Sequence, residues 1–234
     1  MALAIVTGGT KGIGKAICDI LMENGFDISI TARNIDDLNN LKSDYNSRYP
    51  NQDVQVFQVD MSRKGEVINF AEEVCKATDR IDILINNAGT FIPGQIINEE
   101  EGVLEKMIET NLYSAYHMTR GIINKMLTQR KGHIFNMCSI ASFMAYPNGG
   151  SYAISKFALL GFSKSIREEV KDKGVKVTSV MPGATWSASW EGVDLPEERL
   201  MKASDIAKSI YAAYQLSDSA VVEEIVIRPQ LGDL

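Results

Sequence analysis

Short apolar runs rich in β-branched residues alternate with longer amphipathic segments along the chain, and this alternation limits the possible folds more than any other feature. Runs of strand length occupy 3–7, 27–32, 54–59, 81–86, 132–137, 176–181 and 223–227. Segments with a helical period lie at about 12–24, 35–48, 64–78, 99–129, 151–173 and 203–216. Strands that alternate with helices in this way form parallel sheets with helices on both faces. The pattern therefore predicts a doubly wound α/β fold in three layers, with seven strands and at least six helices.

No linker, repeat or low-complexity tract interrupts this pattern, so we assign residues 1–234 to a single domain. The longest stretch without a clear pattern is 183–200, which holds both tryptophans, Trp186 and Trp190. A loop of that length in a compact domain is usually a lid or a binding loop. Because parallel strands end at one edge, ligands of such sheets bind there. We expect that edge to be formed by the loops 8–14, 33–34, 60–62, 87–94, 138–150 and 182–200.

Composition excludes several other classes of protein. Hydrophobic residues make up 45% of the 234 residues, which is enough for a sizeable core and argues against disorder. The net charge of −6 does not favour attraction to nucleic acid or to an anionic membrane. No apolar run reaches the ~18 residues of a membrane span, and no secretion signal precedes Gly8, so we expect a soluble cytoplasmic protein. Three cysteines and two histidines without a motif predict neither a disulfide framework nor a metal site.

A glycine-rich turn from Thr7 to Gly14 directly follows the first predicted strand and leads into a helix. Glycines permit a tight turn, and they let backbone N–H groups approach a pyrophosphate while the helix N-terminus adds partial positive charge. The spacing Gly-x3-Gly-x-Gly, with no Gly-Lys-Ser/Thr ending, argues against a nucleoside-triphosphate loop. A glycine turn with a purely structural role is the alternative, but the position between strand and helix favours a dinucleotide site.

The residue that follows the second predicted strand indicates which dinucleotide is bound. An acid about 20 residues past the glycines accepts the ribose hydroxyls of NAD(H), whereas an arginine there accommodates the 2′-phosphate of NADP(H). Arg33 occupies this position, and Lys11 in the glycine turn offers a second cation. Asp36 and Asp37 are better explained as first-turn residues of the next helix, which Asn34 caps. These residues favour NADP(H), although a solvated surface role for Arg33 is the simpler alternative.

Tyr152 and Lys156 stand four residues apart in a predicted helix, so both side chains project from one face. A tyrosine titrates near pH 10, but a cation about 4 Å away favours its phenolate by about 4 kcal/mol, or about three pKa units before desolvation. The pair is therefore suited to acid/base chemistry near neutral pH. Ser139, after the fifth predicted strand, would hydrogen-bond a substrate carbonyl across the cleft. Asn111 would hold a water that connects the lysine to solvent.

A Tyr-x3-Lys pair occurs often by chance, and its weight here comes from the ordered set of motifs around it. These are Thr7-Gly8-x3-Gly12-x-Gly14, Asp60, Asn86-Asn87-Ala88-Gly89, Asn111, Ser139, Tyr152-x3-Lys156 and Pro182-Gly183. In this order the chain resembles the short-chain dehydrogenase/reductase family over nearly its whole length. The resemblance implies a Rossmann-type sheet and hydride transfer between a nicotinamide and a carbonyl carbon. It also implies homodimers or homotetramers that pair through 99–129 and 151–173.

The resemblance further implies roles for individual residues. Tyr152 is the acid/base, and Ser139 positions the carbonyl. Lys156 binds the nicotinamide ribose and lowers the tyrosine pKa, while Asn111 maintains a proton relay. The implied cofactor residues are Gly8, Thr10, Lys11, Gly12, Ile13, Gly14, Arg33, Asp60, Met61, Asn87, Ala88, Gly89, Tyr152, Lys156, Pro182, Gly183, Thr185 and Ser187. Ser187 stands where the family usually has a threonine that touches the carboxamide, and it keeps a hydroxyl at that offset.

Two parts of the chain indicate different substrates. The stretch 104–183 is similar to 3-oxoacyl-acyl-carrier-protein reductases, whereas 183–234 is more similar to bacterial sepiapterin reductases and diketone reductases. Trp186 and Trp190 suit a flat or apolar substrate, although they equally suit a structural role under the loop. We therefore favour a small carbonyl substrate such as a diketone or a pterin.

Two alternatives stand beside this reading. An acyl carrier protein is acidic, and the basic pairs Arg130-Lys131 and Lys171/Lys173 near two predicted helix ends would receive it, unless they are only solvated helix termini. The other alternative is a redox sensor that binds NADP(H) without turnover. It is disfavoured because the tyrosine and the lysine are both retained.

Overall fold

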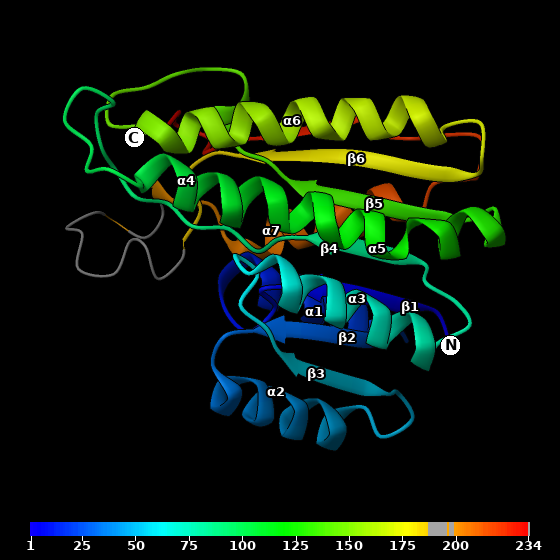
Figure 1. The fold of residues 1–234 in the computed structure, drawn as a ribbon. Coiled ribbons are helices and arrows are strands. Elements are labelled where there is room, and N and C mark those ends of the chain that lie inside the picture. Colours follow the sequence, from blue (N-terminus) through cyan, green and yellow to red (C-terminus); the bar gives the residue numbers. More distant parts are fainter. Residues whose placement is uncertain (187–195, 197–198, 234) are drawn as a thin grey trace.

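In the computed structural model, which describes residues 1–186, 196 and 199–233, the chain forms one seven-stranded parallel sheet (Figure 1). The strands are β1 (Leu3–Thr7), β2 (Asp27–Ala32), β3 (Val54–Gln58), β4 (Ile83–Asn86), β5 (Gly132–Met137), β6 (Val175–Pro182) and β7 (Glu224–Ile227). Their spatial order, β3-β2-β1-β4-β5-β6-β7, changes direction between β1 and β4. The predicted doubly wound α/β sheet is confirmed, and the predicted strand ends differ from these by at most two residues.

Helices cover both faces of the sheet and produce the expected three layers (Figure 1). They are α1 (Gly12–Glu23), α2 (Ile35–Arg48), α3 (Lys64–Ala77), α4 (Val103–Ile108), α5 (Ser114–Gln129), α6 (Gly150–Val170) and α7 (Ala203–Tyr214). Helices α1, α2 and α7 pack on one face, and α3, α5 and α6 pack on the other. None of these described helices is long and apolar enough to span a membrane.

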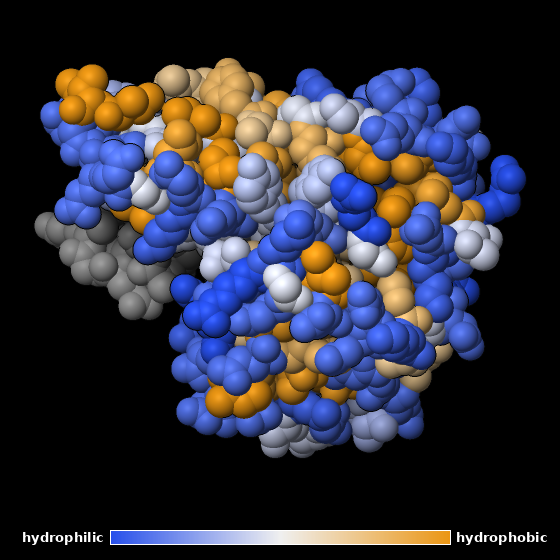
Figure 2. Space-filling view, in the orientation of Figure 1, coloured by the Kyte–Doolittle hydropathy of each residue, from blue (hydrophilic) through white to orange (hydrophobic). Residues whose placement is uncertain are grey.

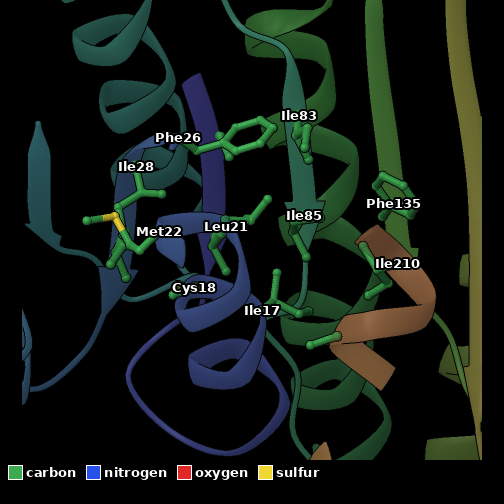
Figure 3. Close-up of a cluster of buried hydrophobic side chains, with 14 of the residues drawn as sticks. Ile17, Cys18, Leu21, Met22, Phe26, Ile28, Ile83, Ile85, Phe135 and Ile210 are labelled. Atoms are coloured by element: carbon green, nitrogen blue, oxygen red, sulfur yellow. The ribbon is translucent and has the colours of Figure 1, made fainter. Parts of the chain in front are cut away.

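Alternate residues of each strand point to opposite faces, which divides the core into two clusters. In β1, Val6 packs beneath α1, α2 and α7, whereas Ile5 packs beneath α3 and α5. Figure 3 shows the first of these clusters, in which Leu21 of α1, Ile85 of β4 and Ile210 of α7 meet. These three side chains are at most 1% exposed. Because helices cover both faces, the central strands are continuous apolar runs, and this makes them recognisable in the sequence.

The predicted helix over 99–129 is interrupted, so that prediction is wrong at two places. Helix α4 begins only at Val103, because Gly102 has a left-handed backbone (φ +89°) that separates the helix from the preceding turn. A π-helical turn, Glu109–Tyr113, then lies between α4 and α5. This wider turn carries Asn111, and such turns are frequent at functional sites.

The surface is not uniform in polarity. Figure 2 shows hydrophobic residues over the part of the molecule formed by α4, α5 and α6, whereas the part over α2 is mainly hydrophilic. Exposed apolar side chains on these helices include Leu104, Tyr116, Ile154 and Phe157, and Tyr113 is exposed on the π-helical turn between α4 and α5. The α4–α6 face therefore exposes a group of apolar side chains, which is unusual for a surface that contacts only water.

Candidate active site

A cavity of about 410 Å³ lies at the carboxyl ends of the strands, where the segments after β1, β4, β5 and β6 meet. The strand order reverses at β1 and β4, which is the position where sheets of this kind bind their ligands. The structure brings nine of the predicted site residues together around this cavity: Ile13, Asn87, Gly89, Ser139, Tyr152, Lys156, Pro182, Gly183 and Thr185.

The glycine turn after β1 is held closed by the loop after β4. The side-chain amide of Asn87 donates hydrogen bonds to two carbonyl oxygens of the turn, at 3.0 and 2.9 Å. A Cβ atom at Gly14 would lie 2.5 Å from that amide nitrogen, so only glycine fits there. Thr10 and Gly12 are half-buried in the same turn. No described side chain caps α1, so its first-turn N–H groups fit an anion such as a pyrophosphate.

The cations predicted to bind the 2′-phosphate lie beside the N-terminus of α2. Arg33 is exposed directly after β2, and Lys11 forms an ion pair of 2.9 Å with Asp37. The Asn34 side chain accepts hydrogen bonds from two first-turn N–H groups of α2, which confirms the predicted cap. This end of β2 therefore carries two exposed cations and one carboxylate that competes for one of them.

Asp60 and Met61 follow β3, and their surroundings differ. Burial pushes the pKa of the Asp60 carboxyl upward, but hydrogen bonds from Ser62 and the charges of Arg63 and Arg33 hold that pKa below its usual range. Met61 is buried in the cluster beneath α3. Asp60 is thus an ionised group at the carboxyl edge of the sheet, whereas the buried Met61 side chain packs beneath the loop after β3.

Ser139, Tyr152 and Lys156 come from two elements that meet at the cavity. Ser139 follows β5 and accepts a hydrogen bond from the N–H of Ala141 (3.1 Å), which fixes it at the start of a short 3-10 turn. Tyr152 and Lys156 lie one turn apart on α6, and the Ser139 side chain is placed so that it favours the phenolate of Tyr152. The buried Lys156 ammonium donates to the carbonyl of Met137 (2.7 Å) and lies 5.7 Å from the centre of the Tyr152 ring. The three side chains form one connected group.

Burial dominates the protonation of this group. It lowers the pKa of Lys156 to about 8, so the ammonium is mostly charged at neutral pH. It raises the pKa of Tyr152, and the hydrogen bond with Ser139 offsets only part of that rise. The expected lowering of the tyrosine pKa by Lys156 is therefore wrong for this structure. The lysine charge is engaged with the Met137 carbonyl, and it does not outweigh the lost hydration of the phenolate.

Asn111, in the π-helical turn, joins the loop after β4 to α6. Its side-chain oxygen accepts from the N–H of Thr90 (2.7 Å), and its nitrogen donates to the Thr90 carbonyl (3.0 Å) and to the Ser155 hydroxyl (2.9 Å). A Cβ atom at Gly89 would lie 3.2 Å from the Asn111 oxygen and 3.6 Å from the Lys156 nitrogen. Asn111 is therefore placed next to the lysine, where it holds the adjoining loop.

Glu99, which no sequence pattern indicated as a site residue, anchors the N-terminus of α6. Its carboxylate accepts hydrogen bonds from the N–H (2.9 Å) and from the hydroxyl of Ser151, the residue before Tyr152. The N–H of Gly94 also donates to the carbonyl of Asn148 (3.1 Å), so the loop after β4 is attached to the start of this helix at two points. A carboxylate is favourable at a helix N-terminus. Glu99 lies in a run of acidic residues near a predicted helix start, so the sequence did not distinguish it from its neighbours.

Further residues line the cavity that were not predicted as site residues, among them Phe91, Met144, Tyr146 and Asp233. Phe91 packs edge-on against Tyr152, with ring centres 4.9 Å apart. The first three lie in loops that were expected at this edge, so their large side chains in those loops were the available signal. Asp233 lies in no such loop, and nothing in its local sequence indicated it.

The predicted substrate residue Trp186 is not among the described residues that line this cavity. Trp186 is 40% exposed and lines a neighbouring cavity with Leu200 and Arg228. Trp190, and the predicted cofactor residue Ser187, lie outside the described residues.

Comparison with known proteins agrees with this geometry. A sequence model of the family described as short chain dehydrogenase matches residues 2–197. An uncharacterized oxidoreductase of Staphylococcus epidermidis is 29% identical over 227 residues, which covers 97% of this chain and 96% of that protein. A metagenomic short-chain oxidoreductase in complex with NADP is 27% identical, with a TM-score of 0.85 over 98% of this chain and 97% of its own. An alcohol dehydrogenase from the archaeon Thermococcus sibiricus, complexed with 5-hydroxy-NADP, is 24% identical with a TM-score of 0.89 over the same shares.

Proposed function

Because this chain belongs to the short-chain dehydrogenase/reductase family of oxidoreductases, we propose that it reduces a small carbonyl compound to an alcohol with NADPH. The observation that carries the proposal is the connected group of Ser139, Tyr152 and Lys156 in one cavity beside the glycine turn. Apolar side chains such as Phe91 and Met144 form much of the remaining wall, which suits a small organic ketone.

The side chains divide the chemistry between them. When bound, NADPH supplies the hydride that reaches the carbonyl carbon. The hydroxyl groups of Ser139 and Tyr152 bind the carbonyl oxygen. The raised pKa of Tyr152 keeps its hydroxyl protonated, so it is ready to give a proton to that oxygen as negative charge develops. Lys156, charged below a pH of about 8, stabilises the phenolate that this step leaves.

The glycine turn and the end of β2 supply the features that fit NADP(H). The first turn of α1 suits the pyrophosphate, and Arg33 with Lys11 suits a 2′-phosphate. Because Lys11 already pairs with Asp37, we expect Arg33 to carry most of the preference. The metagenomic relative in complex with NADP supports the same cofactor.

The basic residues considered for an acyl carrier protein lie at the opposite edge of the sheet from the cavity. Arg130 and Lys131 stand between α5 and the start of β5, and Lys171 and Lys173 stand between α6 and the start of β6. A carrier protein bound there would not deliver its acyl group to the cavity of the same molecule. This favours a freely diffusing substrate.

Loss of reduced-nicotinamide absorbance with the purified protein tests the proposal. We expect diketones or pterins to be reduced with NADPH at a kcat/KM at least about tenfold higher than with NADH, because one phosphate contact is worth about 1.5–3 kcal/mol. Preference for a 3-oxoacyl thioester would instead establish the acyl-carrier alternative. Binding of NADPH without turnover of any carbonyl would favour the redox sensor.

Substitution of Arg33 tests the choice of cofactor. Arg33→Ala should raise the KM for NADPH about 10- to 100-fold and leave the KM for NADH nearly unchanged. Arg48→Ala is the matched control, because Arg48 is an exposed arginine at the other end of α2. Equal effects of Arg33→Ala on both cofactors would contradict the 2′-phosphate role.

We also propose that two copies pair through the apolar α4–α6 face. Tyr116, Ile154 and Phe157 are exposed there, and burial of such side chains favours association. Light scattering should report a dimer or tetramer for the unmodified chain and a smaller species for Phe157→Glu. A monomer before substitution would refute the pairing.

A further inference from the structure

Ser142 lies three residues after Ser139, and its side chain closes the turn that holds Ser139 at the cavity. This turn is the 3-10 helix Ile140–Ser142, which follows β5. The hydroxyl oxygen of Ser142 accepts a hydrogen bond from the N–H of Ser139 (3.2 Å), and the N–H of Ser142 donates to the carbonyl of Ser139 (2.9 Å). Ser142 is 1% exposed and is not among the described residues that line the cavity, so it reaches the site only through Ser139 and its other neighbours.

The turn engages every polar group of Ser139 except its hydroxyl hydrogen. The N–H and the carbonyl of Ser139 are bonded to Ser142, and its hydroxyl oxygen accepts from the N–H of Ala141 (3.1 Å). A serine hydroxyl carries a single hydrogen, which is thereby left for a partner outside the turn. Because Ser139 lines the cavity, the turn presents it there as a hydrogen-bond donor, which is the role that a carbonyl oxygen requires.

The Ser142 hydroxyl is itself oriented by the sulfur of Cys138. Burial raises the pKa of the Cys138 thiol to about 11, and the charge of Lys156 offsets part of the rise. The hydroxyls of Ser142 and Ser179 offset a further part. A hydroxyl that stabilises charge on sulfur directs its hydrogen towards the sulfur, so the oxygen of Ser142 remains an acceptor for the N–H of Ser139.

We propose that Ser142 is a positioning residue, which orients the carbonyl-binding hydroxyl of Ser139 through the reciprocal hydrogen bonds of this turn. This rests on the proposed carbonyl reductase function. An alanine at position 142 leaves the N–H of Ser139 without its acceptor, in a residue that is only 7% exposed. The turn then moves to satisfy that N–H, and the hydroxyl of Ser139 leaves the orientation in which it meets a carbonyl oxygen.

Ser142→Ala tests the proposal in the direction of carbonyl reduction. The kcat with a diketone should fall about tenfold, because a buried donor without an acceptor corresponds to about that factor, and the KM for NADPH should change less than about twofold. Ser165→Ala is the matched control. Ser165 is an exposed serine of α6 whose hydroxyl donates to the carbonyl of Gly161 (2.9 Å), so its removal should leave kcat unchanged. An unchanged kcat in Ser142→Ala would overturn the proposal.

The pH profile separates positioning from a loss of stability. In the reverse direction, alcohol oxidation with NADP⁺, the phenolate of Tyr152 is the base, so the rate rises with pH through the Tyr152 pKa. Burial raises this pKa and the Ser139 side chain lowers it, so a displaced Ser139 should move the profile of Ser142→Ala upward by about half a pH unit or more. An unchanged profile would limit Ser142 to a structural role and overturn the proposal.

Other titratable groups face Tyr152, and a second control separates their effect. They are Lys156 on α6, Cys138 at the end of β5 and Tyr146 in the loop that follows. Ser179→Ala removes the other hydroxyl that lowers the pKa of Cys138, and it should leave the oxidation profile in place. A shift as large as that of Ser142→Ala would assign the effect to Cys138 and overturn the positioning role.

Calorimetry without turnover separates this inference from the proposed function. In protein saturated with NADP⁺, Ser142→Ala should bind a diketone about three- to tenfold more weakly than the unmodified protein, with equal affinity for NADP⁺. Diketone reduction with the same kcat and pH profile in both proteins would overturn the role of Ser142 and uphold the reductase function. If no carbonyl compound were reduced, the reductase function would fail, and equal diketone affinities would then reject the positioning role independently.

Discussion

The two halves of the sheet contribute different groups to the site, main chain in one half and buried side chains in the other. In the half formed by β1, β2 and β3, the predicted site is chiefly the main chain of the glycine turn, where Gly14 has no space for a Cβ atom. In the half formed by β4, β5 and β6, it consists of buried side chains. Lys156 is 5% exposed and Asn111 is 1% exposed, and each is hydrogen-bonded to a main-chain carbonyl.

This difference determines what each half tolerates. A site made of main chain depends on space, so an added atom changes binding and stability together. A site made of buried side chains depends on protonation and orientation, so a change there alters rate and pH dependence first.

Removal of the Tyr152 hydroxyl should have the largest effect. Tyr152→Phe deletes the proton donor and should lower kcat about a thousandfold, because general acid catalysis contributes about 10²–10⁴-fold. Tyr146→Phe is the matched control, since Tyr146 lines the same cavity and burial raises its pKa to about 12. Steady-state kinetics with NADPH would measure kcat for both variants. Comparable losses in the two would contradict the assignment of Tyr152 as the proton donor.

Lys156 should make activity and stability respond to pH in opposite directions. Its folded-state pKa is about 8 against an ordinary value of 10.5, so the unfolded chain binds the extra proton between these values. Stability should therefore rise by about 1.4 kcal/mol per pH unit from pH 8 to 10.5, with the gain absent below pH 8. Activity should fall above pH 8, because the neutral amine no longer stabilises the phenolate.

Urea unfolding and initial rates across this range would measure both trends. Lys156→Met is the reference, because it lacks the titrating group and should lose the extra slope in stability. A parallel dependence on pH in the two proteins would show that another group causes it.

A methyl group added to the glycine turn tests the main-chain half. The Cβ of Gly14→Ala would overlap the Asn87 amide, so we expect a loss of about 2 kcal/mol in unfolding free energy and weaker NADPH binding. Gly161→Ala, in the middle of α6 with nothing within 4 Å of its Cβ, should instead stabilise the protein by about 0.5–1 kcal/mol. Unmodified NADPH affinity in Gly14→Ala would mean that the turn does not hold the cofactor.

The smallest expected effect concerns the anchor of α6. Glu99→Ala removes the acceptor for the Ser151 N–H and should cost about 1 kcal/mol in unfolding free energy. It should also lower kcat more than it raises the KM for NADPH, because the first turn of α6 carries Tyr152. Glu100→Ala, at an exposed position one residue further, is the control. A change in stability without any change in kcat would limit Glu99 to a structural role.

Much of the fold was readable from local patterns. The central strands have continuous apolar runs because helices cover both faces, and the Asn34 cap depends only on the next three residues of the chain. The long helix over 99–129 was not readable in the same way, because Asn111 forms its hydrogen bonds with Thr90 and Ser155, which are distant in sequence.

By itself, the sequence determined the doubly wound sheet, the family and the choice of Ser139, Tyr152 and Lys156, since each depends on short spacing or on the period of apolar residues. Only the tertiary structure decided that burial raises the tyrosine pKa and that Glu99 anchors the helix that carries Tyr152. It also decided that Asp233 reaches the cavity from the end of the chain. Hydration and hydrogen-bond partners are set by residues that are distant in sequence, as the separation of 52 between Glu99 and Ser151 illustrates, and such contacts exist only once the chain has packed.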